Sequence, residues 1–416
     1  MRIIHTSDWH VGRSLHGADL SAAHAQFFDF LCELVDQEQP DALLVAGDIF
    51  DRAIAPVEAV ALVDDALARL CARTRVLLTP GNHDSAGRLA FGQGLLTERL
   101  VMRARVTDVG RAVALPNGAG QVGALIYPLP YLDPDWARLQ LAGSDPQAAS
   151  EDRRQAADDA QTGTLARSHA AVLQAAHRRI AAAHARQLAT HPHWAGLPVV
   201  VSAHAFVVGG RTSDSERDIR VGGVDFAPLE ALSPATGWAP DYLALGHLHR
   251  PQWVGPARPP GGQLARYSGS PLAFSFSEWQ DTKSVSLVEL GERGGAVRLT
   301  AVPTPVWRQL AVLRGPLAEL LSPAHAAHRS AFVSVEVTDA ARPRELVGRV
   351  REVFPHALVV RHAPPALPTP QAASSVAPGP GRDPVQVVAG FLAEVGGRPA
   401  TTVELAEVRA SYEAVR

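Results

Sequence analysis

The sequence predicts an α/β protein: a layered sheet flanked by helices, then a small separate α/β unit and a helical tail. Three observations predict this order. Short apolar runs alternate with helical stretches up to about residue 280, the alternation restarts at residue 308, and a proline-rich stretch sets the tail apart. A chain of 416 residues has room for two or three domains.

Five short apolar runs in the first part of the chain predict strands. Each is rich in valine, isoleucine, leucine or alanine and is followed by polar residues, which is typical of strands buried on both faces. The runs are Ile3–Ile4, Ala42–Ala46, Val76–Leu78, Val199–Val201 and Tyr242–Leu245.

The segment between the first two runs predicts an amphipathic helix. Ser21 is suited to cap its N-terminus, and Pro40 helps to end it. Residues at helical spacing form its apolar side: Phe27, Phe28, Leu31, Leu34 and Val35.

Residues 133–195 interrupt the pattern of strands and helices. They are rich in alanine and polar residues, so they predict a helical insertion. A metal-binding stripe of four regularly spaced histidines is one interpretation of this segment, and a solvated helix face is the one we favour. The histidines are His169, His177, His184 and His191.

The remaining chain predicts four further parts. A β-hairpin is expected at 284–305, and it completes a first domain at residues 1–307. Residues 308–364 have the pattern of strand, helix, strand, helix and strand. Residues 365–384 are rich in proline, alanine, serine and glycine and predict a flexible linker, and two amphipathic helices are expected within 385–416.

Composition leaves several protein classes open and argues against others. The net charge is −3, so any DNA contact must depend on local arginines or on a partner. Cys32 and Cys71 lie in helical stretches and predict core packing, not a disulfide framework. Without a signal-peptide pattern or a spanning apolar run, the chain is expected to be cytoplasmic, with no membrane association.

Residues of metal-binding type follow each of the five predicted strands. Because ligands gather beyond the carboxyl ends of strands in an open sheet, these side chains are expected to meet at one edge. Asp-x-His alone is more often an ordinary polar stretch of the surface, Gly-Asn-His-Asp alone could be a turn, and Gly-His-x-His alone is moderately specific, whereas all five motifs in order predict a site. They are Asp8 and His10; Asp48 and Asp51; Asn82, His83 and Asp84; His204; and His247 with His249.

The ligand types predict a centre of two divalent cations. Imidazole, carboxylate and amide groups without thiolate suit Mn, Fe or Zn. Seven candidates are too many for one ion, and two ions that share a carboxylate are a standard arrangement for phosphoester hydrolysis. His83 differs, because with Asp84 beside it the ring could stay unmetallated and assist the leaving oxygen. The seven candidates are Asp8, His10, Asp48, Asn82, His204, His247 and His249.

At these residues the sequence resembles the calcineurin-like metallophosphoesterases, whose motifs are Asp-x-His, Gly-Asp-x-x-(Asp or His), Gly-Asn-His-(Asp or Glu), His and Gly-His-x-His. Within that family it resembles the SbcD-type nuclease subunits. The second resemblance rests on residues 1–17, on Ser213–Arg217 with Val221–Gly223, on Tyr267–Pro271 and on Phe274–Glu278.

The resemblance implies a sheet sandwich flanked by helices, with manganese as the expected metal. It also implies roles for individual residues. One ion would be held by Asp8, His10, Asp48 and His249, and the other by Asp48, Asn82, His204 and His247. Asp48 would bridge the two ions, His83 would be the catalytic histidine, and Asp84 would orient it.

The resemblance also implies partners. Residues 308–364 would be a capping domain that helps to place DNA, and residues 385–416 would dock on an SbcC-type coiled-coil ATPase. The expected assembly is a heterotetramer with a homodimer of nuclease subunits. It would act in DNA repair, recombination and replication as an exonuclease on duplex ends and an endonuclease on single strands and hairpins. Candidates for phosphate contacts, with an ordinary surface role equally open, are Arg13, His16, Arg52 and Arg88.

Two alternatives share parts of this pattern. A metallophosphoesterase that acts on a small phosphodiester or phosphomonoester would have the same metal centre. The Tyr267–Pro271 stretch, the capping unit and the tail favour the nuclease, because a small substrate does not need them. The second alternative is a non-catalytic scaffold, and the intact ligand set argues against it.

Overall fold

The computed structural model describes residues 1–96, 98–142, 165–207, 209–216, 226–232, 237–255, 264–365, 383–396 and 398–414. Residues 143–164 of the predicted insertion and 366–382 of the predicted linker lie outside these ranges. The chain divides into two compact units. The first comprises residues 1–312, 330–334 and 356–359, and the second comprises residues 313–329, 335–355 and 360–416.

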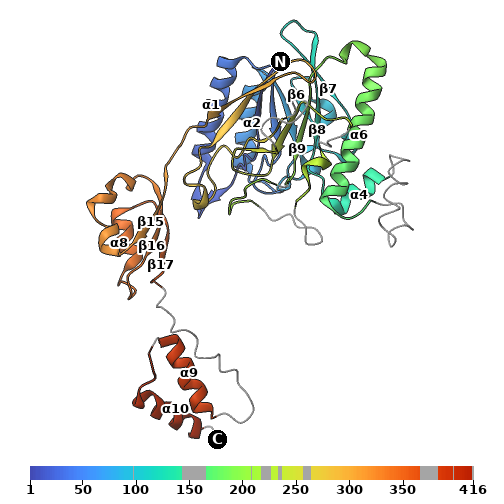
Figure 1. The fold of residues 1–416 in the computed structure, drawn as a ribbon. Coiled ribbons are helices and arrows are strands. Elements are labelled where there is room, and N and C mark those ends of the chain that lie inside the picture. Colours follow the sequence, from blue (N-terminus) through green and yellow to red (C-terminus); the bar gives the residue numbers. More distant parts are fainter. Residues whose placement is uncertain are drawn as a thin grey trace. The chain divides into compact units, whose positions relative to one another are not determined.

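Two six-stranded sheets form the centre of the first unit (Figure 1). In sheet order, the first sheet contains β14 (Val297–Pro303), β13 (Ser284–Leu290), β1 (Arg2–Thr6), β4 (Ala42–Ala46), β5 (Arg75–Thr79) and β6 (Leu100–Met102). The second contains β11 (Gln252–Val254), β12 (Leu264–Tyr267), β10 (Tyr242–Gly246), β9 (Val199–His204), β8 (Val122–Leu129) and β7 (Val113–Pro116).

Apolar side chains between the two sheets form the central core. Ile3 and Leu44 of the first sheet belong to the same buried cluster as Ile126 and Val200 of the second. The outer face of the first sheet is covered by α1 (Ser21–Glu38) and α2 (Val57–Cys71), and that of the second by α4 (Pro134–Ala142) and α6 (His169–Thr190). The unit therefore has the layers helix, sheet, sheet, helix, and the predicted fold class is confirmed.

All five predicted strands and the predicted hairpin are present, but the strands do not share one sheet. The first three are β1, β4 and β5, whereas the last two are β9 and β10 of the facing sheet. The hairpin is β13 and β14. Smaller elements of this unit are β2 (Ser14–Leu15), β3 (Ala18–Asp19), α3 (Ala86–Leu89) and the 3-10 turns Gln93–Leu95, Val106–Asp108, Pro192–Trp194, Leu229–Ala231 and Phe276–Glu278.

Helix α1 buries the apolar side that the sequence predicted, because all five of those residues pack in the cluster beneath it. Its N-terminus differs from the prediction. Ser21 is the first helical residue, and Asp19 Oδ1 accepts hydrogen bonds from the Ser21 backbone N–H and hydroxyl at 3.0 and 2.7 Å. The helix ends at a left-handed Gln39 directly before Pro40.

The histidine stripe of α6 faces the protein interior, so the favoured solvated face is wrong. His169, His177 and His184 are buried beside Val172 and Ile180. A seven-residue spacing returns to nearly the same face of a helix, and here that face covers the second sheet. In the part of the chain that the structure describes, none of the clusters suited to a metal ion includes these histidines.

The later chain forms a three-stranded sheet with the order β15 (Leu310–Gly315), β16 (Phe332–Val337) and β17 (Ala357–His362). It also contains α7 (Leu317–Leu320), the 3-10 turn Pro323–His328 and α8 (Leu346–Val353), whose Val350 is buried. The two tail helices are α9 (Pro384–Gly396) and α10 (Thr402–Ala414), which contact each other. No helix in the described ranges has both the length and the apolarity to cross a lipid bilayer.

Candidate metal centre

The predicted ligands lie at the carboxyl ends of strands from both sheets. In the first sheet β1, β4 and β5 run parallel, and in the second β9 and β10 run parallel. The loops that leave these strands bring the side chains together between the sheets, and six of the seven are buried: Asp8, His10, Asp48, His204, His247 and His249. The seventh, Asn82, is half-buried.

The backbone is strained at several of these positions. Seven non-glycine residues of the described chain have φ in the left-handed region, and four of them are predicted ligands. Such conformations cost on the order of 1–3 kcal/mol each and gather at functional sites, where the surrounding structure enforces them. The four are Asp8, His10, Asp48 and His247, with φ of 53°, 46°, 51° and 113°.

Glycines next to the ligands allow the loops to approach closely. A Cβ atom on Gly81 would lie 2.1 Å from Asp48 Oδ1 and 2.4 Å from the Asp48 backbone nitrogen. A Cβ atom on Gly246 would lie 1.9 Å from the carbonyl oxygen of Ala46, in the facing sheet. These two glycines are thus required by space, since neither contact can be made with a side chain present.

Asp48 lies at the middle of the centre. Its Oδ2 atom is 3.5 Å from His10 Nε2 and also 3.5 Å from His204 Nε2. Its Oδ1 atom accepts a hydrogen bond from the backbone N–H of His83 at 2.8 Å, which fixes the carboxylate. One oxygen of Asp48 therefore faces both halves of the ligand set.

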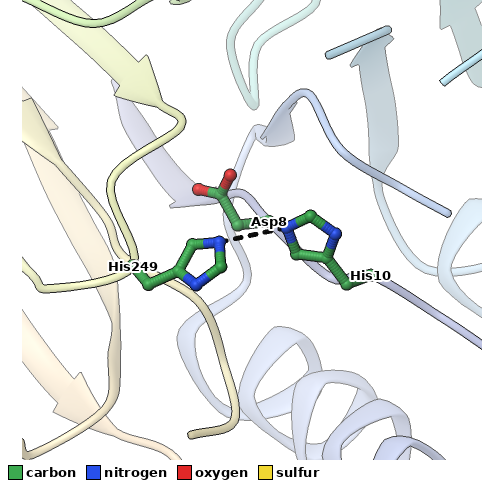
Figure 2. A group of neighbouring side chains, drawn as sticks. All are labelled: Asp8, His10 and His249. Atoms are coloured by element: carbon green, nitrogen blue, oxygen red, sulfur yellow. Dashed lines mark hydrogen bonds between the residues drawn. The ribbon is translucent and has the colours of Figure 1, made fainter. Parts of the chain in front are cut away.

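The first half contains Asp8, His10 and His249 (Figure 2). The Nε2 atoms of the two imidazoles lie 3.1 Å apart, and the three residues can offer ligand atoms that all lie within 4.8 Å of one another. Asp8 is held by the backbone N–H of His247, which donates to its two oxygens at 3.0 and 3.1 Å.

The second half contains Asn82, His204 and His247. Asn82 Oδ1 lies 2.8 Å from His204 Nε2 and 3.2 Å from His247 Nδ1. The other ring nitrogen of His204 lies 3.0 Å from the carbonyl oxygen of Ala46, which fixes the tautomer because a carbonyl can only accept. His204 Nε2 therefore keeps its lone pair toward Asp48 and Asn82.

His83 lies beside this set, with its ring 4.7 Å from that of His10. Its Nδ1 atom is 2.7 Å from the carbonyl oxygen of Asp51. The Asp84 oxygens accept backbone N–H groups of Gly81, Ile49 and Phe50 at 2.9 to 3.0 Å. Asp84 therefore holds together the two loops that present Asp48 and His83.

The electrostatics of the centre suit cations. Burial, together with the neighbouring Asp84 and Asp8, raises the pKa of Asp48 well above its usual value. Burial and the surrounding histidines lower the pKa of His10 and His247, so their rings stay neutral. A metal ion binds neutral imidazoles and deprotonated carboxylates. A bound cation would also relieve the repulsion among the carboxylates that raises the pKa of Asp48. The residues present thus fit two divalent ions.

Several residues that support the ligands were not predicted from the sequence. Ser7 Oγ donates to Asp8 Oδ2 at 2.5 Å, and Ser215 Oγ lies 2.5 Å from His249 Nδ1. Ser215 also contacts Glu278, which pairs with Lys283 at 2.6 Å. Burial would raise the pKa of Glu278, but the His249 ring and the Lys283 ammonium outweigh it and hold that pKa well below its usual value. Two signals were available: Lys283 is the only lysine of the chain, and Ser215 and Glu278 lie in two of the stretches that carry the resemblance to SbcD-type subunits.

The four candidates for phosphate contacts differ in their surroundings. Arg13 is held inside the protein, since it donates to the carbonyl oxygen of Ser215 at 2.7 Å and lies over the Phe274 ring. Arg52 and Arg88 are exposed, and the exposed His16 stacks on Phe276. Arg52 and Arg88 are thus better placed than Arg13 to meet a large ligand.

Comparison with known proteins agrees with this geometry. Residues 1–134 match the family model of calcineurin-like phosphoesterases, and residues 306–395 match that of the type 5 capsule protein repressor C-terminal domain.

Several curated relatives are named as the SbcD component of the nuclease SbcCD. The one from Escherichia coli (strain K12) is 32% identical over 77% of this chain and 72% of its own length. The one from Rhodobacter capsulatus is 35% identical over 77% of this chain and 75% of its own, and the one from Bacillus subtilis is 35% identical over 70% and 66%. The chain therefore belongs to the SbcD family of nuclease subunits, within the calcineurin-like phosphoesterases.

Proposed function

We propose that this chain is a two-metal DNA nuclease that works with an SbcC-type ATPase in DNA end processing. The observation that carries the proposal is the position of Asp48, whose Oδ2 atom lies 3.5 Å from a histidine of each half of the ligand set. The membership in the SbcD family makes DNA the favoured substrate over a small phosphoester.

The chain's own residues supply the ligands of both ions. Asp8, His10 and His249 would hold one, Asn82, His204 and His247 the other, and Asp48 would be shared. When bound, such a pair of ions offsets the negative charge that develops on the phosphate oxygens and acidifies the attacking water. Manganese is our proposal for the metal, because the resemblance to SbcD-type subunits implies it and the donor set of imidazole, carboxylate and amide groups is compatible with it.

His83 is proposed to assist the leaving oxygen. Its Nδ1–H donates to the carbonyl oxygen of Asp51, so Nε2 is the ring atom that would take up a further proton, and the protonated ring would then donate it to the leaving oxygen. The turn that presents the ring is fixed at both ends, by Asp48 Oδ1 on the His83 backbone N–H and by Asp84 on the backbone of Gly81. This fixed turn places the ring next to His10 without requiring it to bind metal.

The other parts of the chain complete the proposed assembly. The α/β unit at 308–364 would help to place DNA, and the tail at 385–416 would dock on the ATPase. Two nuclease subunits would pair as a homodimer within a heterotetramer. A cytoplasmic location belongs to the proposal, because bacterial chromosomal DNA lies there.

A cleavage assay tests this function. The purified chain, with and without an SbcC-type ATPase and ATP, is incubated with end-labelled duplex and hairpin DNA and Mn²⁺, and in parallel with a small phosphodiester. We expect DNA cleavage that EDTA abolishes and that Asp48→Asn loses. Turnover of the small phosphodiester without cleavage of any DNA would contradict the proposed substrate, and unchanged cleavage by Asp48→Asn would contradict the proposed site.

A further inference from the structure

A buried ion pair lies behind the predicted ligand His249. Lys283 Nζ is 2.6 Å from Glu278 Oε2, and the side chains are 7% and 0% exposed. Removing two charges from water costs several kcal/mol for each ion, and a buried pair often stabilises a fold no better than apolar residues of the same size. A role besides stability is therefore the better explanation for this pair.

Three different residues hold His249 at three of its atoms. Lys283 Nζ donates to the His249 carbonyl oxygen at 2.8 Å, and Glu216 Oε1 accepts from the His249 backbone N–H at 2.9 Å. Ser215 Oγ lies 2.5 Å from ring atom Nδ1. The opposite ring nitrogen, Nε2, faces His10 (Figure 2).

The hydrogen bonds behind the ring determine its tautomer. The Glu278 carboxylate can only accept, and its Oε1 atom receives the hydroxyl proton of Ser215. Because a hydroxyl has one proton, Ser215 Oγ must then accept at its other contacts, which are with His249 Nδ1–H and with the hydroxyl of Ser213. Protonation of Nδ1 leaves the lone pair of Nε2 directed toward Asp8 and His10, where a metal ligand needs it.

Ser215 belongs to a short segment, residues 213–216, that we call the strap. Ser213 Oγ lies 3.1 Å from Glu278 Oε1, and the Asp214 backbone N–H donates to Ser277 Oγ at 3.1 Å. Arg13 adds a hydrogen bond to the Ser215 carbonyl oxygen. The strap is thus fixed on the segment that carries Glu278, which sets Ser215 against the ring.

We propose that the strap and the Glu278–Lys283 pair are positioning elements that fix the tautomer and orientation of His249, and so set the metal affinity of the half-site formed with Asp8 and His10. The proposal rests on the two-metal function above. It predicts that substitutions in this network weaken the binding of one of the two ions and leave the binding of the other unchanged.

The first test uses Ser215→Ala in the full chain. Mn²⁺ is titrated into the metal-free protein, and binding is followed by electron paramagnetic resonance, which distinguishes single Mn²⁺ ions from coupled pairs. We expect one ion to bind about 10–100-fold more weakly, so that the coupled signal is lost while a single-ion signal remains. The matched control is Ser286→Ala, which removes another buried hydroxyl of the same unit, one that accepts from Arg266; it should keep the coupled signal.

The second test separates positioning from folding. Glu278→Gln alone leaves a buried ammonium without its charge partner and can unfold the chain. The double variant Glu278→Leu/Lys283→Met removes both charges and also the acceptor of the Ser215 proton, so we expect it to fold and still lose the coupled signal. Wild-type Mn²⁺ affinity in Ser215→Ala and in the double variant would overturn this inference alone, whereas a wild-type chain that binds no Mn²⁺ would overturn the proposed function as well.

Discussion

At the scale of single residues, the distances around Asp48 distinguish shared ligation from simple ion pairing. A carboxylate that paired with one histidine would approach that ring more closely than the other. Asp48 Oδ2 instead lies at the same distance from His10 Nε2 and His204 Nε2, and its other oxygen is held by a backbone N–H group. This symmetrical position fits a carboxylate that bridges two cations.

His83 should affect the chemical step and not metal binding. We expect His83→Gln to lower kcat for DNA cleavage on the order of 10²–10⁴-fold, which is the usual contribution of a general acid or base, while two Mn²⁺ ions still bind. Rates under single-turnover conditions and the Mn²⁺ stoichiometry check this. The control is His193→Gln, an exposed histidine outside the centre, which should keep the wild-type rate. Loss of an ion in His83→Gln would instead make His83 a ligand, as its proximity to His10 and Asp48 allows.

His5 should make the metal-free protein sensitive to acid. Burial and the charge of Arg266 lower the pKa of His5 to about 3, and its Nδ1 atom lies 2.9 Å from the Tyr242 hydroxyl. As pH falls below 6.5, the ring is protonated in the unfolded chain but not in the folded one, so the free energy of unfolding decreases until about pH 3.

Replacing His5 by leucine should remove that part of the pH dependence. From pH 7 to pH 5, the decrease in the free energy of unfolding should be about 2 kcal/mol smaller in the variant than in the wild type. Urea denaturation of the metal-free proteins at the two pH values measures the difference. Equal losses in the two proteins would show that His5 does not carry this linkage.

At the scale of elements, the loop after β5 depends on a glycine. Gly81→Ala would place its Cβ atom 2.1 Å from Asp48 Oδ1, so Asp48 must move away from the shared position. We expect Mn²⁺ affinity to fall on the order of 10–100-fold, as for other changes that displace a metal ligand indirectly.

The matched control for Gly81→Ala is Gly87→Ala in α3, where a new Cβ atom meets nothing within 4 Å. That variant should bind Mn²⁺ as the wild type does and should be slightly more stable, because alanine favours a helix over glycine. Calorimetric titration with Mn²⁺ compares the two. Equal affinities in Gly81→Ala and Gly87→Ala would mean that the close approach of the two loops is not needed.

Much of the order of strands and helices can be predicted from the sequence, because a run of apolar residues indicates a segment that is buried in the fold. The five runs, the hairpin and the units after residue 308 all form the predicted elements. The division into two sheets could not be predicted, since a buried strand looks the same in either sheet. Strand β8 (Val122–Leu129) was missed, although it lies next to β9 in the second sheet. The buried histidines of α6 were misread because polar residues alone do not reveal which face a helix buries.

The candidate metal centre, too, could be predicted only in part from the sequence. The predicted ligands follow strands directly, so their motifs could be recognised, and the structure brings them together. The support behind them could not be predicted: the stretches that contain Ser215 and Glu278 were noticed, but these residues and Lys283 meet His249 only through folding. Contacts between segments that are distant in the sequence leave no local pattern.

At the scale of the whole molecule, the tail should bind the partner and leave the chemistry alone. Its helix α9 exposes Phe391 and Val388, which are 61% and 38% exposed. Exposed apolar side chains of this kind suit a protein interface. We expect Phe391→Asp to weaken association with an SbcC-type ATPase at least about tenfold, measured by co-purification and titration, with Mn²⁺ binding unchanged. Full association of this variant would argue against α9 as the docking element.

Two divalent cations are expected to share Asp48, and anomalous X-ray scattering from Mn²⁺-soaked crystals of the full chain would locate both ions. We predict two anomalous peaks, one beside Asp8, His10 and His249 and the other beside Asn82, His204 and His247, with Asp48 between them. A single peak that leaves Asp48 uncoordinated, or no peak among these ligands, would show that the two ions are not held in this way.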